Sequence, residues 1–122
     1  MVSSARTVFF FGIYLILVGL NLLVAPNFML RLFELPETNE VWVRVVGMLV
    51  LYLGFYYAQA GRMEWAGFIK LSVYTRSTAL VFFAGFVLLG FAEPPFIMFG
   101  ALDFLGAMWT WWALRLEGRV SA

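Results

Sequence analysis

Two ionisable residues lie far inside long apolar stretches, and they are the first candidates for chemistry. Arg76 lies eight residues into the stretch 68–91, and Asp103 lies eight residues into the stretch 95–116. In helices that rise 1.5 Å per residue, each backbone is then about 12 Å from one end of its helix. If the two helices are antiparallel neighbours across an apolar layer about 30 Å thick, the two backbones differ in height by about 6 Å. An arginine side chain covers that difference, so the sequence predicts an ion pair between Arg76 and Asp103.

Three further polar side chains are expected near this pair. Arg44 lies one turn inside the stretch 41–60, from where its long side chain reaches outward to Glu40 or lipid phosphate, or inward to Asp103. Asn21 lies at a similar depth in the first stretch, with Tyr14 seven residues before it on the same helical face. The candidate ligand-binding residues are therefore Tyr14, Asn21, Arg44, Arg76 and Asp103. Two arginines against one aspartate leave positive charge, which suits an anionic headgroup or a polarised carbonyl.

A purely structural interpretation of the same charges stays open. A paired buried charge can fix which helices meet without binding any ligand. Residue type and spacing do not separate this interpretation from a binding site.

Composition indicates the surroundings of these residues. The chain has 122 residues, of which 64% are hydrophobic and 12% are charged, whereas a soluble domain is about 45–50% apolar and about 25% charged. So little charge cannot cover the surface of a small soluble domain. The sequence therefore predicts one integral membrane domain over residues 1–122, with the lipid bilayer as its surroundings.

Residue counts also exclude several kinds of site. The chain has no cysteine and no histidine, which removes thiol nucleophiles, cysteine–zinc sites, and the commonest metal ligand and general base. A net charge of +1 gives no basic surface for nucleic acid. We expect no cofactor, no bound metal, no nucleic-acid partner and no catalytic residues.

Hydropathy and proline positions predict an all-α fold, a four-helix transmembrane bundle. A bilayer core takes about 20 helical residues, and the stretches that fit are 8–25, 41–60, 68–91 and 95–116. Pro26 and the pair Pro94–Pro95 belong at helix ends because proline cannot donate to the helical ladder. The first stretch is long for a signal peptide and no Ala-x-Ala site follows it, so we expect it to be a retained helix.

A short apolar segment and the distribution of charge predict how the bundle is oriented. Residues 27–35 are too few to span a bilayer and are expected to form an interfacial helix between spans 1 and 2. Four spans place both termini on one side. The basic residues expected on that side are Arg6, Arg62, Lys70, Arg115 and Arg119, against Arg31 and Arg44 on the other. This excess predicts that both termini are cytoplasmic.

Stripes of small residues predict where the helices touch. One stripe begins at Asp103 and continues through Gly106, Ala107, Thr110 and Ala113; the other begins at Arg44 and continues through Gly47, Leu51, Gly54 and Ala58. Small residues allow membrane helices to approach closely. The stripes are expected to face the bundle interior, chiefly as packing surfaces.

Three segments carry a resemblance to a known class of protein. These are residues 14–20 followed by Pro26, the segment WVRVVG at 42–47 and the segment DFLGA at 103–107. The chain resembles small four-span bacterial inner-membrane proteins of unknown function. The resemblance implies a location in the bacterial inner membrane and implies no activity.

These observations favour a non-enzymatic membrane protein that binds a small ligand or a lipid headgroup in a polar cavity in the outer half of the bundle. The first alternative is an accessory or scaffold subunit of a larger membrane complex, working with a partner subunit or as a homo-oligomer. A transporter or channel has less support because no broken mid-membrane helix or ring of charge is present in the sequence. An enzyme has the least support because no nucleophile–base pair or metal-ligand set is present.

Overall fold

The structure is a computed structural model that describes residues 3–118. Its long helices are α1 (Ser3–Val24), α3 (Val41–Arg62), α4 (Ala66–Leu88) and α5 (Ile97–Leu116). A short helix α2 (Pro26–Leu32) follows α1, and a 3-10 turn η1 (Pro94–Phe96) precedes α5. Four segments are long enough and apolar enough to cross a membrane. The predicted four-helix transmembrane bundle is therefore confirmed, and the chain is a small integral membrane protein.

The helices begin and end where local chemistry requires. Pro26 and Pro94 are the first residues of α2 and η1, where a missing backbone N–H costs nothing. Helix α4 ends three residues before the predicted boundary because Gly90 adopts a positive φ of 81°. The Phe91 N–H then donates to the Phe86 carbonyl at 2.8 Å, closing the last turn.

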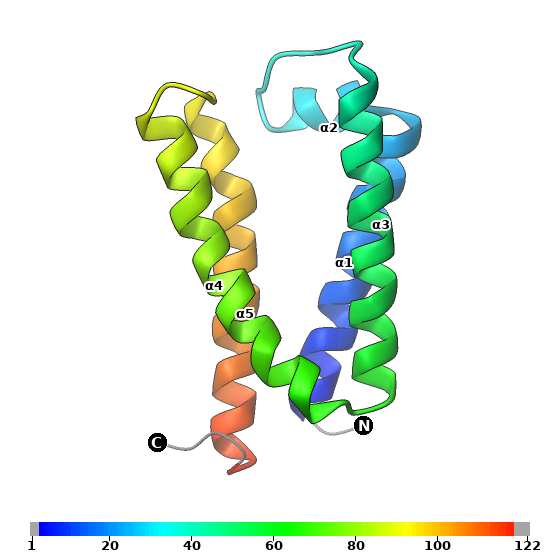
Figure 1. Cartoon of the computed structure of the whole chain (residues 1–122), viewed down its shortest axis with the longest axis vertical. Helices are drawn as coiled ribbons and strands as arrows, with labels where there is room; N and C mark the ends of the chain where they lie inside the picture. Colours follow the sequence, from blue (N-terminus) through cyan, green and yellow to red (C-terminus); the bar gives the residue numbers. More distant parts are fainter. Residues whose placement is uncertain (1–2, 119–122) are drawn as a thin grey trace.

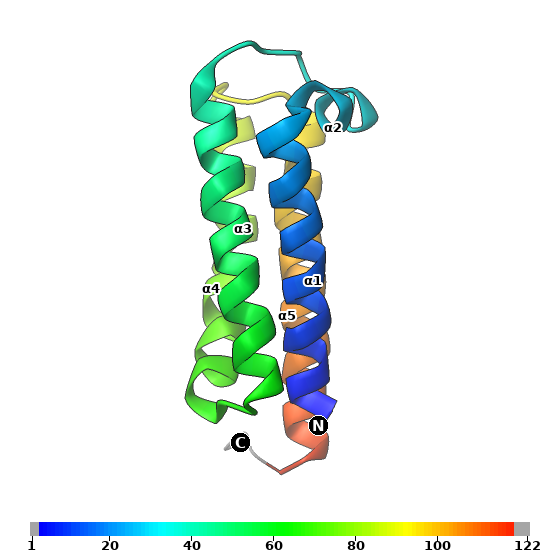
Figure 2. The same ribbon diagram turned by 90° about the vertical axis from the view of Figure 1, so that its right-hand side faces the viewer.

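The helices are arranged as two antiparallel pairs. Helix α1 packs along α3, and α4 packs along α5 (Figure 2). We call the end where α1 begins and α5 finishes the closed end, and the end with the turns 25–40 and 89–96 the open end. Figure 1 shows that the two pairs meet at the closed end and diverge toward the open end.

The α1–α3 pair is held by backbone-to-backbone contact at glycines. A Cβ added to Gly12 would lie 2.5 Å from the backbone nitrogen of Ala58, and one added to Gly19 would lie 2.5 Å from that of Leu51. The prediction that the small residues of the stripe beginning at Arg44 face a neighbouring helix is confirmed, since a Cβ added to Gly47 or Gly54 would lie 2.6 or 2.7 Å from a backbone nitrogen of α1. Such contacts leave no room for side chains between the helices, so α1 and α3 form one unit.

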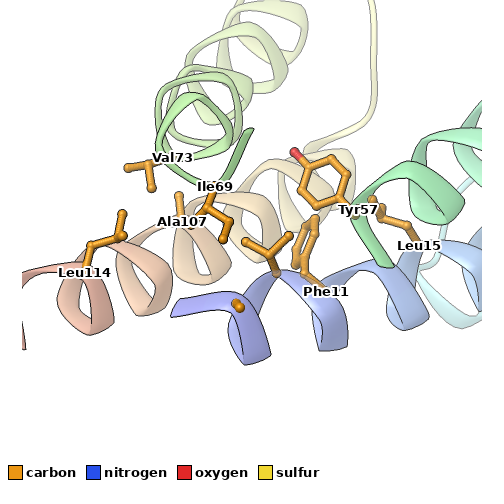
Figure 3. Packing of buried hydrophobic residues seen from close by; sticks show 9 residues of the cluster. Phe11, Leu15, Tyr57, Ile69, Val73, Ala107 and Leu114 are labelled. Carbon is orange, nitrogen blue, oxygen red and sulfur yellow. The ribbon is translucent and has the colours of Figure 1, made fainter. Parts of the chain in front are cut away.

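The apolar core lies at the closed end, where all four long helices meet (Figure 3). Its buried residues are Ala5, Val8, Phe11, Leu15, Tyr57, Ile69, Val73, Ala107 and Leu114. On α5, Ala107, Thr110 and Ala113 are buried, as the stripe predicts. The core therefore fastens the two pairs together at one end only.

The connection between α1 and α3 folds over the open end. The predicted interfacial helix 27–35 is present as α2 but ends at Leu32. The Asn27 side-chain oxygen accepts a hydrogen bond from the Thr38 N–H at 2.9 Å, and Arg31 forms an exposed ion pair with Glu37 at 3.2 Å. These contacts hold the segment 33–40 against α2.

Candidate functional site

A cavity of about 320 Å³ lies in the half of the bundle toward the open end. Every long helix contributes to its walls, together with α2 and η1. The lining residues are Tyr14, Leu15, Val18, Leu22, Leu30, Val43, Val46, Val50, Phe83, Phe96, Phe99 and Asp103. Its size is at the small end of the range for small-molecule sites, about 300–1,000 Å³.

The cavity exists because each helix pair is tight while the contact between the pairs is partial. Glycines close the α1–α3 interface, and Gly100 brings α5 against Leu80 and Phe83 of α4. The shared core ends near Leu15 and Tyr57. Beyond that level, bulky side chains from the two pairs face each other across the space.

Asp103 and Tyr14 supply the polar groups of this apolar wall. Helices α1 and α5 are antiparallel, and the Phe11 ring lies against Gly106, where an added Cβ would be 2.8 Å from it. One turn further toward the open end, this register brings Tyr14 opposite Asp103, and both line the cavity. Within residues 3–118, no hydrogen bond or ion pair holds the Asp103 carboxylate, so it is available to a donor in the cavity.

Arg76 lies on the closed-end side of the cavity, surrounded by aromatic rings and hydroxyl groups. Its side chain is 3% exposed. The guanidinium carbon lies 4.7 Å from the centre of the Phe11 ring and 5.4 Å from that of Tyr57. Nη2 donates to the hydroxyls of Ser72 at 3.0 Å and Thr110 at 2.8 Å, and Nε donates to the Ser72 carbonyl at 3.2 Å. Nη1 has no hydrogen-bond partner.

The predicted ion pair between Arg76 and Asp103 is wrong. Within residues 3–118, no ion pair joins these two residues, whereas Arg31 is paired with Glu37. Helical side chains lean toward the N-terminus of their own helix. In the antiparallel pair α4–α5, Arg76 therefore leans toward the closed end, where it reaches Ser72 one turn back, and Asp103 leans toward the open end.

Arg44 has a role at a helix end, outside the cavity. Its Nη1 donates to the carbonyls of Leu23 at 2.6 Å and Val24 at 3.1 Å, at the C-terminus of α1. These carbonyls have no partner within the helix, and a cation there is favoured by the helix dipole. Within residues 3–118, Arg44 forms no hydrogen bond or ion pair with Glu40 or Asp103, so those two expectations are wrong, whereas its contact with lipid phosphate stays a prediction.

Asn21 is separate from the cavity as well. It is half-buried, it is not among the lining residues, and its side-chain oxygen is buried without a hydrogen-bond partner. Of the five candidate residues, the structure brings together Tyr14 and Asp103 and places the other three elsewhere.

A series of linked hydrogen bonds between polar side chains at the closed end was not predicted from the sequence. The Ser4 hydroxyl and N–H donate to the Glu117 carboxylate at 2.6 and 2.8 Å, and the Thr7 hydroxyl donates to the Ser4 carbonyl at 2.7 Å. The Thr7 and Thr110 hydroxyls are 2.6 Å apart, and Thr110 accepts from Arg76. The spacing of Ser4 and Thr7, which places both on the α1 face that also carries Phe11, was the available signal.

Comparison of the chain with models of known protein families, with curated proteins and with solved structures finds no match. The resemblance to small four-span bacterial proteins therefore stays a prediction.

The chemistry open to the cavity follows from its walls. One carboxylate and one phenol face an apolar space, and residues 3–118 hold no group of three or more acidic, histidine or cysteine side chains that could bind a metal ion. Such a wall can hold an apolar body and accept or donate a small number of hydrogen bonds.

Proposed function

We propose that this small integral membrane protein binds a small, largely apolar molecule in the cavity between its helix pairs, without catalysing a reaction. The observation that carries the proposal is the Asp103 carboxylate, which lines an apolar cavity and has no partner within residues 3–118. Asp103 is partly buried, so its carboxylate is partly removed from water, and a ligand that donates to it would supply hydrogen bonds that no residue in the range 3–118 supplies.

The kind of ligand differs from the one expected from the sequence. An anionic headgroup was favoured by two arginines beside Asp103. Because Arg44 binds the end of α1 and Arg76 lies among its own ring and hydroxyl partners, neither faces the cavity. The expected ligand therefore presents a hydrogen-bond donor to the carboxylate.

Native mass spectrometry of the protein released from mild detergent tests this proposal. We expect the wild-type protein to carry a small adduct. Val50→Trp fills the cavity and should remove it, whereas Val81→Trp, at a lipid-facing position on α4 that is 71% exposed, should keep it. An adduct-free mass for the wild-type protein and both variants would contradict ligand binding.

A second candidate function is that of an accessory subunit. It is supported by two exposed tyrosines on α3. Tyr52 lies near the middle of α3 and is 55% exposed, and Tyr56, one turn closer to the end of α3, is 61% exposed. A hydroxyl at that depth finds no water in lipid, so a polar partner helix would satisfy it. Cross-linking in the membrane at Tyr52, followed by mass spectrometry, should then identify a stoichiometric partner or a second copy of this chain.

We also infer a location in the bacterial inner membrane with both termini in the cytoplasm. Support comes from α1 beginning and α5 finishing at the same end (Figure 1). Of the basic residues assigned to that side, Arg119 lies outside the described residues, and the other four still outnumber Arg31 and Arg44.

A further inference from the structure

We propose that the occupant of the cavity is a cationic amphiphile, a molecule with an ammonium group and a short apolar body, which enters from the open end. This inference rests on the proposed function, since it names the chemical class of the ligand for the same cavity.

The entry route is a second hollow, of about 380 Å³, at the open end. It lies between the segment that precedes α3 and the turn between α4 and η1. Its lining residues are Leu30, Leu35, Pro36, Thr38, Glu40, Val43, Gly90, Phe91, Ala92, Glu93 and Phe96. Leu30, Val43 and Phe96 also line the cavity, so the hollow is adjacent to it and we call it the mouth.

The charged side chains that line the mouth and the cavity, among residues 3–118, are all acidic. Glu40 and Glu93 are the charged residues that line the mouth, and Asp103 is the charged residue that lines the cavity, among residues 3–118. No lysine or arginine of that range lines either space. The basic residues at this end are used elsewhere, since Arg44 binds the α1 carbonyls and Arg31 pairs with Glu37. A hollow with carboxylates and low-dielectric walls concentrates cations and repels anions.

The cavity offers an ammonium group suitable partners at its far wall. The Asp103 carboxylate accepts charge-assisted hydrogen bonds, and the Tyr14 oxygen on the opposite helix accepts another. Phe83, Phe96 and Phe99 form a cluster of rings, with the centroids of Phe83 and Phe96 5.0 Å apart. Aromatic faces attract a cation and also pack against an alkyl body. A neutral alcohol would keep the packing and lose the charge, and a carboxylate would face repulsion.

Protection of a single cysteine tests this inference in zwitterionic phosphatidylcholine nanodiscs. The chain has no native cysteine, so Val18→Cys places one thiol in the cavity wall. Leu17→Cys, one residue away and 63% exposed to lipid, is the matched control. The rate of maleimide labelling is measured with octylamine, octanol or octanoate, three probes with the same alkyl tail.

We expect octylamine to slow labelling of Val18→Cys at a concentration about tenfold lower than octanol, the factor that a charge-assisted hydrogen bond gives. Octanoate should protect Val18→Cys least of the three probes. The labelling rate of Leu17→Cys should change equally with octylamine, octanol and octanoate. Adding Asp103→Asn to Val18→Cys should abolish the advantage of octylamine and leave protection by octanol intact. Adding Glu93→Gln should weaken the protection of Val18→Cys by octylamine. Adding Glu34→Gln, at an exposed acidic position outside the mouth, should leave that protection unchanged.

The possible failures are distinguishable. Equal protection by octylamine and octanol, unchanged by Asp103→Asn, would overturn the cationic ligand and leave ligand binding standing. Protection by none of the three probes would overturn the proposed function together with this inference.

Discussion

The Thr7 hydroxyl of α1 lies 2.6 Å from the Thr110 hydroxyl of α5, and this hydrogen bond joins the two helix pairs across the bundle. Both side chains are buried, with exposed fractions of 2% and 0%. Thr110 also accepts a hydrogen bond from Arg76 of α4. One hydroxyl thus connects three helices at the closed end.

Thr110→Val should destabilise the protein by about 1–3 kcal/mol, because it removes the hydrogen bond to Thr7 and leaves one N–H of the buried Arg76 guanidinium without its acceptor. Reversible unfolding in mixed micelles of increasing dodecyl sulfate content measures this change. Thr78→Val, at an exposed position of α4, is the control and should shift stability by less than about 0.5 kcal/mol. Equal effects of the two substitutions would contradict the role of Thr110.

Gly12→Ala should destabilise the α1–α3 pair by about 1–3 kcal/mol, the usual cost of forcing extra volume into a packed interface. The new Cβ would meet the backbone nitrogen of Ala58 at 2.5 Å, and backbone cannot rotate away as a side chain can. Gly85→Ala is the matched control, since nothing lies within 4 Å of its added Cβ. Thermal unfolding in detergent should show a lower Tm for Gly12→Ala and an equal or higher Tm for Gly85→Ala, because alanine favours helix.

Arg44→Gln should cost about 1–2 kcal/mol of stability, because the carbonyls of Leu23 and Val24 lose a charged donor. The ratio of octylamine to octanol protection should stay unchanged, since Arg44 does not line the cavity. Arg31→Gln, which breaks only an exposed ion pair, should cost less than about 1 kcal/mol. A loss of ligand selectivity in Arg44→Gln would contradict its assignment to the end of α1.

Arg76→Lys should destabilise the bundle by about 2 kcal/mol or more, because an ammonium cannot stack on Phe11 and Tyr57 while also reaching Ser72 and Thr110. The control is Arg115→Lys, where the guanidinium lies over Trp111 at an exposed position, 5.0 Å from the ring centre. That substitution should cost at most about 1 kcal/mol. Equal unfolding free energies for the two variants would show that the rings and hydroxyls around Arg76 add nothing to stability.

Reporter fusions should place both ends of the chain on one side of the membrane. Fluorescent protein fused after the last residue should fluoresce, as it does in the cytoplasm, and alkaline phosphatase fused at that position should be inactive. A phosphatase inserted in the segment 33–40 should be active. The reverse pattern would contradict the orientation inferred from the excess of basic residues at the closed end.

Hydropathy and proline were enough to predict the four spans and the short helix after the first, because lipid requires long apolar helices and proline limits where they begin. The small stripes also predicted packing faces. The seven-residue spacing of Gly47, Gly54 and Gly61, matched by Ala5, Gly12 and Gly19, was a signal for the α1–α3 interface that was not used.

The candidate site was less predictable. Counting residues gave the heights of Arg76 and Asp103, but an ion pair also depends on the direction in which each side chain leans. The cavity depends on how far two helix pairs diverge, which is set by the sum of side-chain volumes along four helices. The residues next to Tyr14 or Asp103 in the sequence do not indicate this total volume, so they could not predict the cavity.

The divergence of the helix pairs makes the protein a wedge, narrow at the closed end and broad at the open end (Figure 1). A wedge displaces unequal areas of lipid from the two leaflets of a bilayer. In a bilayer, the leaflet at the open end would have to make room for the broader of the two ends.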